Sequence, residues 1–204
     1  MRKLVISEWV SLDGVFDADT MKQWFHPYDS KDRQAHITEL VLASDAFLFG
    51  RVTYEMLAGY WPNVKNNDKD DLEIANRLNS SPKYVVSSTL KQAEWSNSTI
   101  INNSVVKEIT GLKQQPGHNI LVFGSATLVE SLMDADLIDE YRLLVHPIIM
   151  GSGKRAFKDG MATTKLKLGE TTTVSSLVIS LCYQRAQVQT IAFSHSARSP
   201  RREN

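Results

Sequence analysis

Apolar positions in this chain follow two patterns, short continuous runs and a spacing of three and four residues. Short apolar runs predict buried strands at residues 4–10, 46–49, 83–87, 99–101, 120–123 and 138–147. Apolar residues spaced by three and four predict one-sided helices at residues 36–43, 66–79, 104–112 and 125–133. Ser104 is expected to cap the third of these helices. This order of strands and helices predicts an α/β fold with a mostly parallel sheet flanked by helices.

The pattern changes after Lys165. Leu166 and Leu168, followed by residues 174–183, predict two strands joined through residues 169–173, an antiparallel hairpin at the sheet edge. The chain then becomes polar. We expect one domain over residues 1–187 and a polar, disordered tail over residues 188–204.

Two of the predicted strands run directly into a glycine that opens a helix, at Gly50 and at Gly124. At such a junction unpaired backbone N–H groups and the positive end of the helix dipole attract an anion. One junction alone is equally consistent with an ordinary capped helix. Two junctions predict a long ligand with separated anchoring points, such as a dinucleotide.

Polar side chains follow these strand ends. Arg51 and Thr53 come directly after Gly50, and an arginine fork binds two phosphate oxygens at once. Ser87, Ser88 and Thr89 end the next strand, and ligands of open parallel sheets lie beyond the carboxyl ends of strands. Hydroxyls and a cation there would suit the 2'-phosphate of NADPH, which NADH lacks. A serine pair alone is also ordinary turn chemistry.

Composition narrows the class of protein. The 204 residues are 42% hydrophobic, enough for one substantial core, and 23 Lys and Arg balance 23 Asp and Glu. This balance predicts neither a nucleic-acid nor a membrane-surface partner. The single cysteine, Cys182, and an apolar start that is interrupted at Ser7 and Glu8 predict an unexported, soluble, cytoplasmic protein.

The sequence disfavours a nucleotide-triphosphate P-loop and a metal site. The segment Gly151-Ser152-Gly153-Lys154 has Ile148 and Arg155 where a P-loop needs glycine and a hydroxyl residue, so it predicts only a glycine loop near the cofactor. The five histidines lack ligand spacing, and we predict no metal site. His146, inside an apolar strand, is interpreted as a core histidine.

Six motifs together carry a family resemblance. They are Ser11-Leu12-Asp13-Gly14, residues 50–55, residues 84–90, residues 123–128, residues 137–141 and residues 147–153. In this order they resemble the dihydrofolate-reductase-like superfamily, especially stand-alone relatives of the reductase domain of the bifunctional riboflavin-biosynthesis deaminase/reductase. The resemblance spans roughly residues 1–185 and implies an NADPH-binding α/β domain that often forms homodimers.

The resemblance also implies site residues. The adenosine phosphate end would be held by Gly50, Arg51, Thr53, Ser87, Ser88 and Thr89. The pyrophosphate would be held by Gly124, Ser125, Ala126, Thr127 and Leu128. Ser11 and Trp24 would flank the nicotinamide and the substrate.

Two positions depart from the family pattern. Dihydrofolate reductases carry an acid early in the helix before the first glycine junction. This chain has Gln34 or its neighbours Arg33 and Ala35 at that place, with Asp32 nearby but offset. Folate is therefore not the expected substrate. The second junction often has two glycines in the family, and Ser125 takes the second place here.

The expected reaction is hydride transfer from NADPH to a C=N or C=O group of a small heterocycle, as in 5-amino-6-(5-phosphoribosylamino)uracil reductases. Asp13 is the first candidate to orient or relay the accompanying proton, although Asp13-Gly14 is also a plain turn. The alternative is an NADP-binding module without turnover, acting as a sensor or dimeric partner. Nucleic-acid binding through the arginines of the tail ranks last.

Overall fold

A computed structural model describes residues 1–65, 69–161, 163–175 and 177–186. Within these ranges eight strands form one sheet: β1 Leu4–Ser11, β2 Ser44–Gly50, β3 Lys83–Val86, β4 Ser98–Ile101, β5 Asn119–Phe123, β6 Glu140–His146, β7 Leu166–Thr173 and β8 Ile179–Arg185. The helices are α1 Met21–Trp24, α2 Lys31–Leu42, α3 Arg51–Tyr60, α4 Lys69–Ser80, α5 Val105–Gln114 and α6 Ala126–Asp134. Three single 3-10 turns, η1 Ala18–Thr20, η2 His26–Tyr28 and η3 Trp61–Asn63, connect them.

The strands lie in the order β4-β3-β2-β5-β1-β6-β8-β7. All neighbours from β4 to β6 are parallel, and β8 pairs antiparallel with both β6 and β7. The predicted α/β class with a mostly parallel sheet and an antiparallel C-terminal edge is therefore confirmed.

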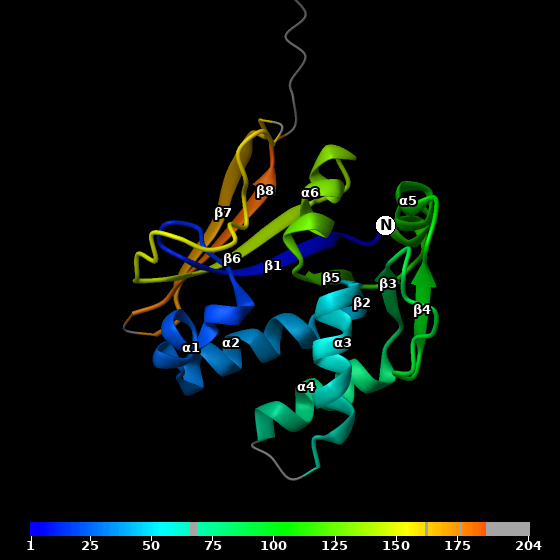
Figure 1. Cartoon of the computed structure of the whole chain (residues 1–204), viewed down its shortest axis with the longest axis horizontal. Coiled ribbons are helices and arrows are strands. Elements are labelled where there is room, and N and C mark those ends of the chain that lie inside the picture. The colour runs from blue at the N-terminus through cyan, green and yellow to red at the C-terminus, as the bar shows by residue number, and fades with distance from the viewer. Residues whose placement is uncertain (66–68, 162, 176, 187–204) are drawn as a thin grey trace, which may run out of the picture.

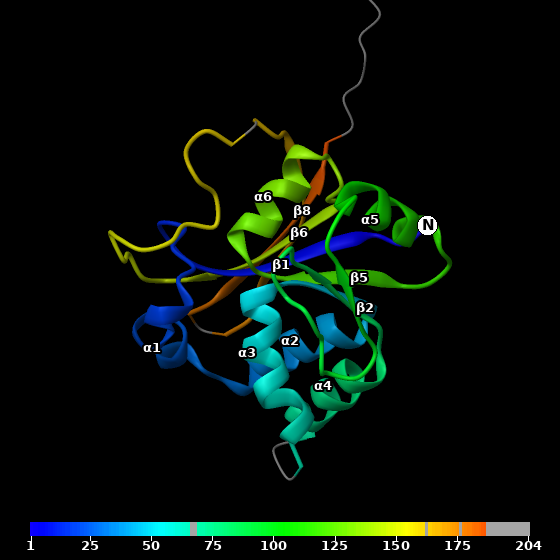
Figure 2. The same cartoon turned by 45° about the vertical axis from the view of Figure 1, so that its right-hand side comes forward.

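Helices cover both faces of the sheet, with α2, α3 and α4 on one side and α5 and α6 on the other (Figures 1 and 2). The strands between these layers are buried on both faces. In β1, for example, Leu4 and Ile6 belong to one core cluster and Val5 to the other. This explains why the central strands read as continuous apolar runs rather than alternating ones.

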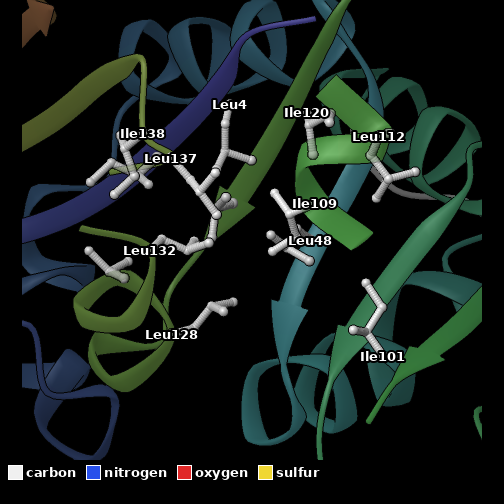
Figure 3. Close-up of a cluster of buried hydrophobic side chains, with 14 of the residues drawn as sticks. Leu4, Leu48, Ile101, Ile109, Leu112, Ile120, Leu128, Leu132, Leu137 and Ile138 are labelled. Carbon is white, nitrogen blue, oxygen red and sulfur yellow. The ribbon is translucent and has the colours of Figure 1, made fainter. Parts of the chain in front are cut away.

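The cluster under α5 and α6 ties distant parts of the sequence together. Figure 3 shows Leu4, Leu48 and Ile120 from three adjacent strands in one cluster with Ile109 of α5 and Leu132 of α6. Each fully buried aliphatic side chain of this kind contributes about 1.5 to 3 kcal/mol of transfer free energy. This packing holds β2, β5 and β1 together as neighbours beneath α5 and α6.

Three local predictions are wrong. Residues 169–173 are not the hairpin connection but part of β7, which bulges between Leu168 and Glu170. The helix predicted from residue 36 begins at Lys31, because the Ser30 hydroxyl accepts a hydrogen bond from the Arg33 N–H at 3.2 Å. Ser104 precedes α5 in the left-handed region, with φ +48°, and makes no capping bond with its side chain.

Two further predictions meet the limits of the described chain. The predicted tail and its arginines lie outside the described residues. Among the described residues, no helix combines the length and the apolar character that crossing a bilayer requires.

Candidate functional site

The carboxyl ends of β3, β2 and β5 lie side by side at one edge of the sheet. Gly50 of β2 is in register with Val86 of β3, so Arg51 and Ser87 each follow directly beyond paired residues. The neighbour on the other side, β5, ends at Phe123, just before Gly124. The structure thus brings the predicted cofactor-binding segments of three strands to the same edge.

The two glycine junctions touch one another. A Cβ atom added to Gly50 would lie 2.6 Å from Ser125 Oγ, and one added to Gly124, at φ +48°, would lie 3.3 Å from Thr53 Oγ1. The expectation of separated anchoring points is therefore wrong for the junctions themselves. Because β2 and β5 are neighbours in the sheet, the junctions form one continuous surface.

That surface presents two helix N-termini without side-chain caps. Neither Gly50 before α3 nor Ser125 before α6 makes a side-chain capping bond to the helix that follows. First-turn N–H groups that are left uncapped are suited to bind a phosphate, and the two helix dipoles favour a negative charge there. The arrangement fits the diphosphate of a dinucleotide, held by the first turns of α3 and α6.

The side chains expected at the 2'-phosphate are engaged within their own elements. Arg51 forms an i,i+4 ion pair with Glu55 at 2.8 Å, and both side chains are exposed. The Ser87 hydroxyl accepts from the N–H groups of Thr89 at 3.1 Å and Leu90 at 2.9 Å. Ser88 and Thr89 are exposed. A phosphate at this edge would have to draw Arg51 away from Glu55.

A cavity of about 170 Å³ opens beside the junctions. Its lining, drawn mainly from β1, α1, α2, α3, α4 and the end of β5, is almost wholly apolar or aromatic: Ser7, Glu8, Trp9, Phe16, Ala18, Met21, Trp24, Ile37, Val41, Thr53, Met56, Leu57, Trp61, Ile74, Leu78, Phe123 and Gly124. Trp24, predicted to flank the substrate, is a buried part of this wall. Its Nε1–H donates to the Asp17 carbonyl oxygen at 3.1 Å, which holds the ring in place.

Glu8 lines the cavity but was not predicted from the sequence as a site residue. It is only 3% exposed, its Oε1 has no hydrogen-bond partner, and its carboxyl group accepts a hydrogen bond from the Gly124 backbone. Burial raises the pKa of Glu8 to about 8, although that hydrogen bond lowers it. The sequence did contain a signal, because Glu8 is an acidic residue inside an apolar run of the kind that forms a strand buried on both faces.

Asp13 and Ser11 have a different role. Asp13 accepts hydrogen bonds from the Ser11 hydroxyl at 2.7 Å and from the backbone N–H groups of Met150 at 3.0 Å and Gly151 at 2.9 Å. These bonds, that from Ser11 first, lower the pKa of Asp13 to about 2. Neither residue lines the cavity. An ionised carboxylate so placed holds the loop after β6, and its predicted part in proton transfer gains no support from this geometry.

The remaining polar candidates pack within the fold. A Cβ atom on Gly153 would lie 2.7 Å from Val15 Cγ1, so the glycine loop packs closely against the segment after β1. His146 is buried, with Nδ1 3.2 Å from the Val10 carbonyl oxygen. In the described ranges, His, Cys, Asp and Glu side chains form no group of three that could hold a metal ion.

Comparisons with known proteins agree with this architecture. The chain is 33% identical over 184 residues to the uncharacterized protein YyaP of Bacillus subtilis (strain 168), covering 89% of this chain and 94% of that protein. A putative riboflavin biosynthesis protein from Shewanella sp. PV-4 has the same fold, with TM-score 0.68 at 19% identity over 91% of this chain and 99% of that chain.

The fold extends to dihydrofolate reductase. The enzyme from Enterococcus faecalis, solved in complex with NADP(H), matches with TM-score 0.59 at 14% identity over 90% of this chain and 96% of that chain. The model of the RibD C-terminal domain matches residues 2–180. This chain therefore belongs to the RibD C-terminal domain family and has a dihydrofolate-reductase-like fold.

Proposed function

We propose that this protein is an NADPH-dependent reductase of small heterocyclic substrates, of the kind that includes ribosylaminopyrimidines. The observation that carries the proposal is the contact between two uncapped helix N-termini beside an apolar cavity. Membership of a family named for a riboflavin-biosynthesis domain supports the reaction class. A dihydrofolate reductase of the same fold binds NADP(H), which supports the cofactor.

Different residues of the chain would bind the diphosphate, the adenosine phosphate and the substrate ring. The first turns of α3 and α6, from Gly50 and Gly124 onward, would bind the diphosphate. Arg51, Thr53 and the hydroxyls of residues 87–89 would bind the adenosine phosphate. When bound, the cofactor supplies hydride. The apolar cavity would orient the acceptor ring and exclude water from the reacting carbons.

We also propose that the chain forms homodimers through the edge strand β7. The edge strand β7 is exposed along its length, with Leu166 38% and Leu168 50% exposed. An exposed edge strand with leucines is a surface on which a second chain can pair. The same edge in a second copy would extend the sheet.

A cofactor titration tests the proposed function. We expect NADPH to bind about 10- to 100-fold more tightly than NADH, because charge-assisted bonds to a 2'-phosphate contribute about 1.5 to 3 kcal/mol. Arg51→Ala should bring NADPH affinity down toward that of NADH, while Lys107→Ala, on α5, should leave it unchanged. Equal affinity of the wild type for both cofactors would contradict the 2'-phosphate site.

Turnover distinguishes the reductase from a binding module. The absorbance of the nicotinamide band is followed with a panel of aminouracils, cyclic imines and carbonyl compounds. Loss of the band with at least one ring substrate is the expected result. Tight NADPH binding with no loss across the panel would favour the sensor or partner module.

A further inference from the structure

The wall of the cavity is almost wholly apolar, so the few polar groups in it decide how a substrate ring is oriented. We propose that the Ser7 hydroxyl is the orienting group, and that it forms a hydrogen bond with a nitrogen or oxygen atom of one flat, uncharged ring. The inference rests on the proposed reductase function. It names a substrate class and a residue that determines specificity for it.

Strand alternation places the Ser7 side chain on the cavity side of the sheet. Successive side chains of a strand point to opposite faces, and β1 pairs with β6 in unbroken register. Leu4 and Ile6 belong to the core cluster under α5 and α6. Val5 belongs to the cluster on the other face, and Trp9 packs against it. Ser7 alternates with Val5 and Trp9, so it faces the side on which α2, α3 and α4 line the cavity (Figure 1).

The Ser7 hydroxyl is free to bind a ligand. It has no hydrogen-bond partner among the described residues, although the residue is only 5% exposed. Other buried polar atoms without a partner, such as Ser98 Oγ and Glu8 Oε1, are sealed from solvent, whereas Ser7 Oγ is not one of these sealed atoms. Because Ser7 lines the cavity, a ligand there can supply the missing hydrogen bond, and a buried hydroxyl without one costs free energy.

The neighbours of Ser7 in the sheet leave its hydroxyl to the cavity. Phe123 of β5 is in register with Ser7 and is itself part of the lining. Arg142 of β6 is also in register with Ser7, but its Nε donates to Glu140 Oε1 at 2.7 Å. Neither Arg142 nor any other arginine, lysine or histidine belongs to the described lining. The polar contact that Ser7 offers is therefore an uncharged one.

The aromatic wall favours a flat ring. Trp9 stacks on Phe25 with ring centroids 4.4 Å apart and planes 13° from parallel. Phe123 meets Trp9 edge-on, with centroids 6.4 Å apart at 61°. Rings held in this way offer stacking and edge contacts to a further ring. The cavity volume of about 170 Å³ is similar to the roughly 150 Å³ cavity that holds benzene, so it suits a single ring.

The cavity adjoins the surface proposed for the cofactor. Thr53 and Gly124 line the cavity and also belong to the two glycine junctions. A ring that Ser7 orients would therefore lie beside that surface. A phosphate or carboxylate in the cavity would lose its water without gaining a cation from the described lining. The charged part of a larger substrate would stay outside while its ring enters.

Fluorine NMR titrations of the whole chain test the proposal without requiring turnover. The probes are fluorobenzene, 3-fluoropyridine, which has a nitrogen in the ring, and 4-fluorobenzoate, which carries a negative charge. We expect the wild type to bind both uncharged rings and to bind the benzoate about 10-fold or more weakly than fluorobenzene.

Three variants isolate the hydroxyl. Ser7→Ala should weaken binding of 3-fluoropyridine by about 5- to 100-fold, because its nitrogen loses a partner, and should leave fluorobenzene within about 2-fold. Ser7→Thr keeps a hydroxyl and should keep the binding of both rings. Ser131→Ala, an exposed change on α6, is the matched control and should alter neither. A serine with a purely structural role would weaken both uncharged rings alike.

The outcomes separate the ring site from the reductase function. Equal losses of both uncharged rings in Ser7→Ala, or no loss of either, would overturn Ser7 as the orienting group. Binding of 4-fluorobenzoate as tight as that of fluorobenzene would overturn the uncharged-ring class. Ring binding that depends on Ser7, with NADPH binding but no turnover of any ring compound, would support the ring site and overturn the reductase function.

Discussion

Two carboxylic acids near the end of β1 have opposite chemistry. Glu8 lies in the strand, buried, with a pKa raised to about 8 by loss of water, whereas Asp13 lies in the turn that follows, with a pKa lowered to about 2 chiefly by the Ser11 hydroxyl. One is an acid at neutral pH and the other an acceptor. The environment, and not the residue type, decides which of the two carboxyl groups is protonated at neutral pH.

The largest effect on stability should come from Glu8. Its folded pKa, about 8, exceeds the ordinary 4.5, so the unfolded chain loses its proton first and the stability of the wild type falls as pH rises from 4.5 to 8. Glu8→Gln has no such titration. Relative to wild type it should gain roughly 4 kcal/mol between these limits. Denaturant unfolding at pH 4.5 and pH 8 measures the difference, and parallel pH curves would contradict the buried neutral acid.

The contribution of Asp13 to the free energy of unfolding should change at acidic pH. Its pKa is lowered from 3.8 to about 2, so its contribution to stability is present above pH 3.8 and is lost as the pH falls toward 2. Asp13→Asn should lower the melting temperature at pH 7 and flatten the acid limb of its pH dependence. An unchanged melting temperature of Asp13→Asn at pH 7 would contradict the role of Asp13 in holding the loop after β6.

The contact between the glycine junctions predicts a rescue. Gly50→Ala would place a Cβ atom 2.6 Å from Ser125 Oγ, and the resulting shift should weaken NADPH binding and cost about 1 to 3 kcal/mol of stability. Adding Ser125→Gly removes the clashing hydroxyl. Calorimetry of the double-mutant cycle should show a coupling of about 0.5 to 3 kcal/mol. Additive effects would mean that the two junctions do not share one surface.

A substitution at the β7 edge should have the smallest effect on cofactor binding. Leu168→Lys places a charge on a half-exposed position of the edge strand, which should prevent pairing with a second copy. Light scattering should then give half the mass of the wild type, with cofactor affinity unchanged. A wild type that is already monomeric would contradict the dimer.

Much of the fold could be predicted from sequence because its signals are local. The apolar runs of β1, β2 and β5 identify strands buried on both faces, and glycines mark where helices begin. Local signals also misled where other interactions prevailed. The Ser30 cap extends α2, and pairing with β8 draws residues 169–173 into β7.

The sequence by itself determined the α/β class, the order of the motifs and the residues at the strand ends. The tertiary structure alone decided that β5 lies between β2 and β1, so that the glycine junctions touch and Glu8 lies beside Gly124. Strand order and burial depend on residues far apart in the chain, and a carboxyl pKa depends on the water that those residues exclude. No local pattern around Glu8 or Asp13 contains that information.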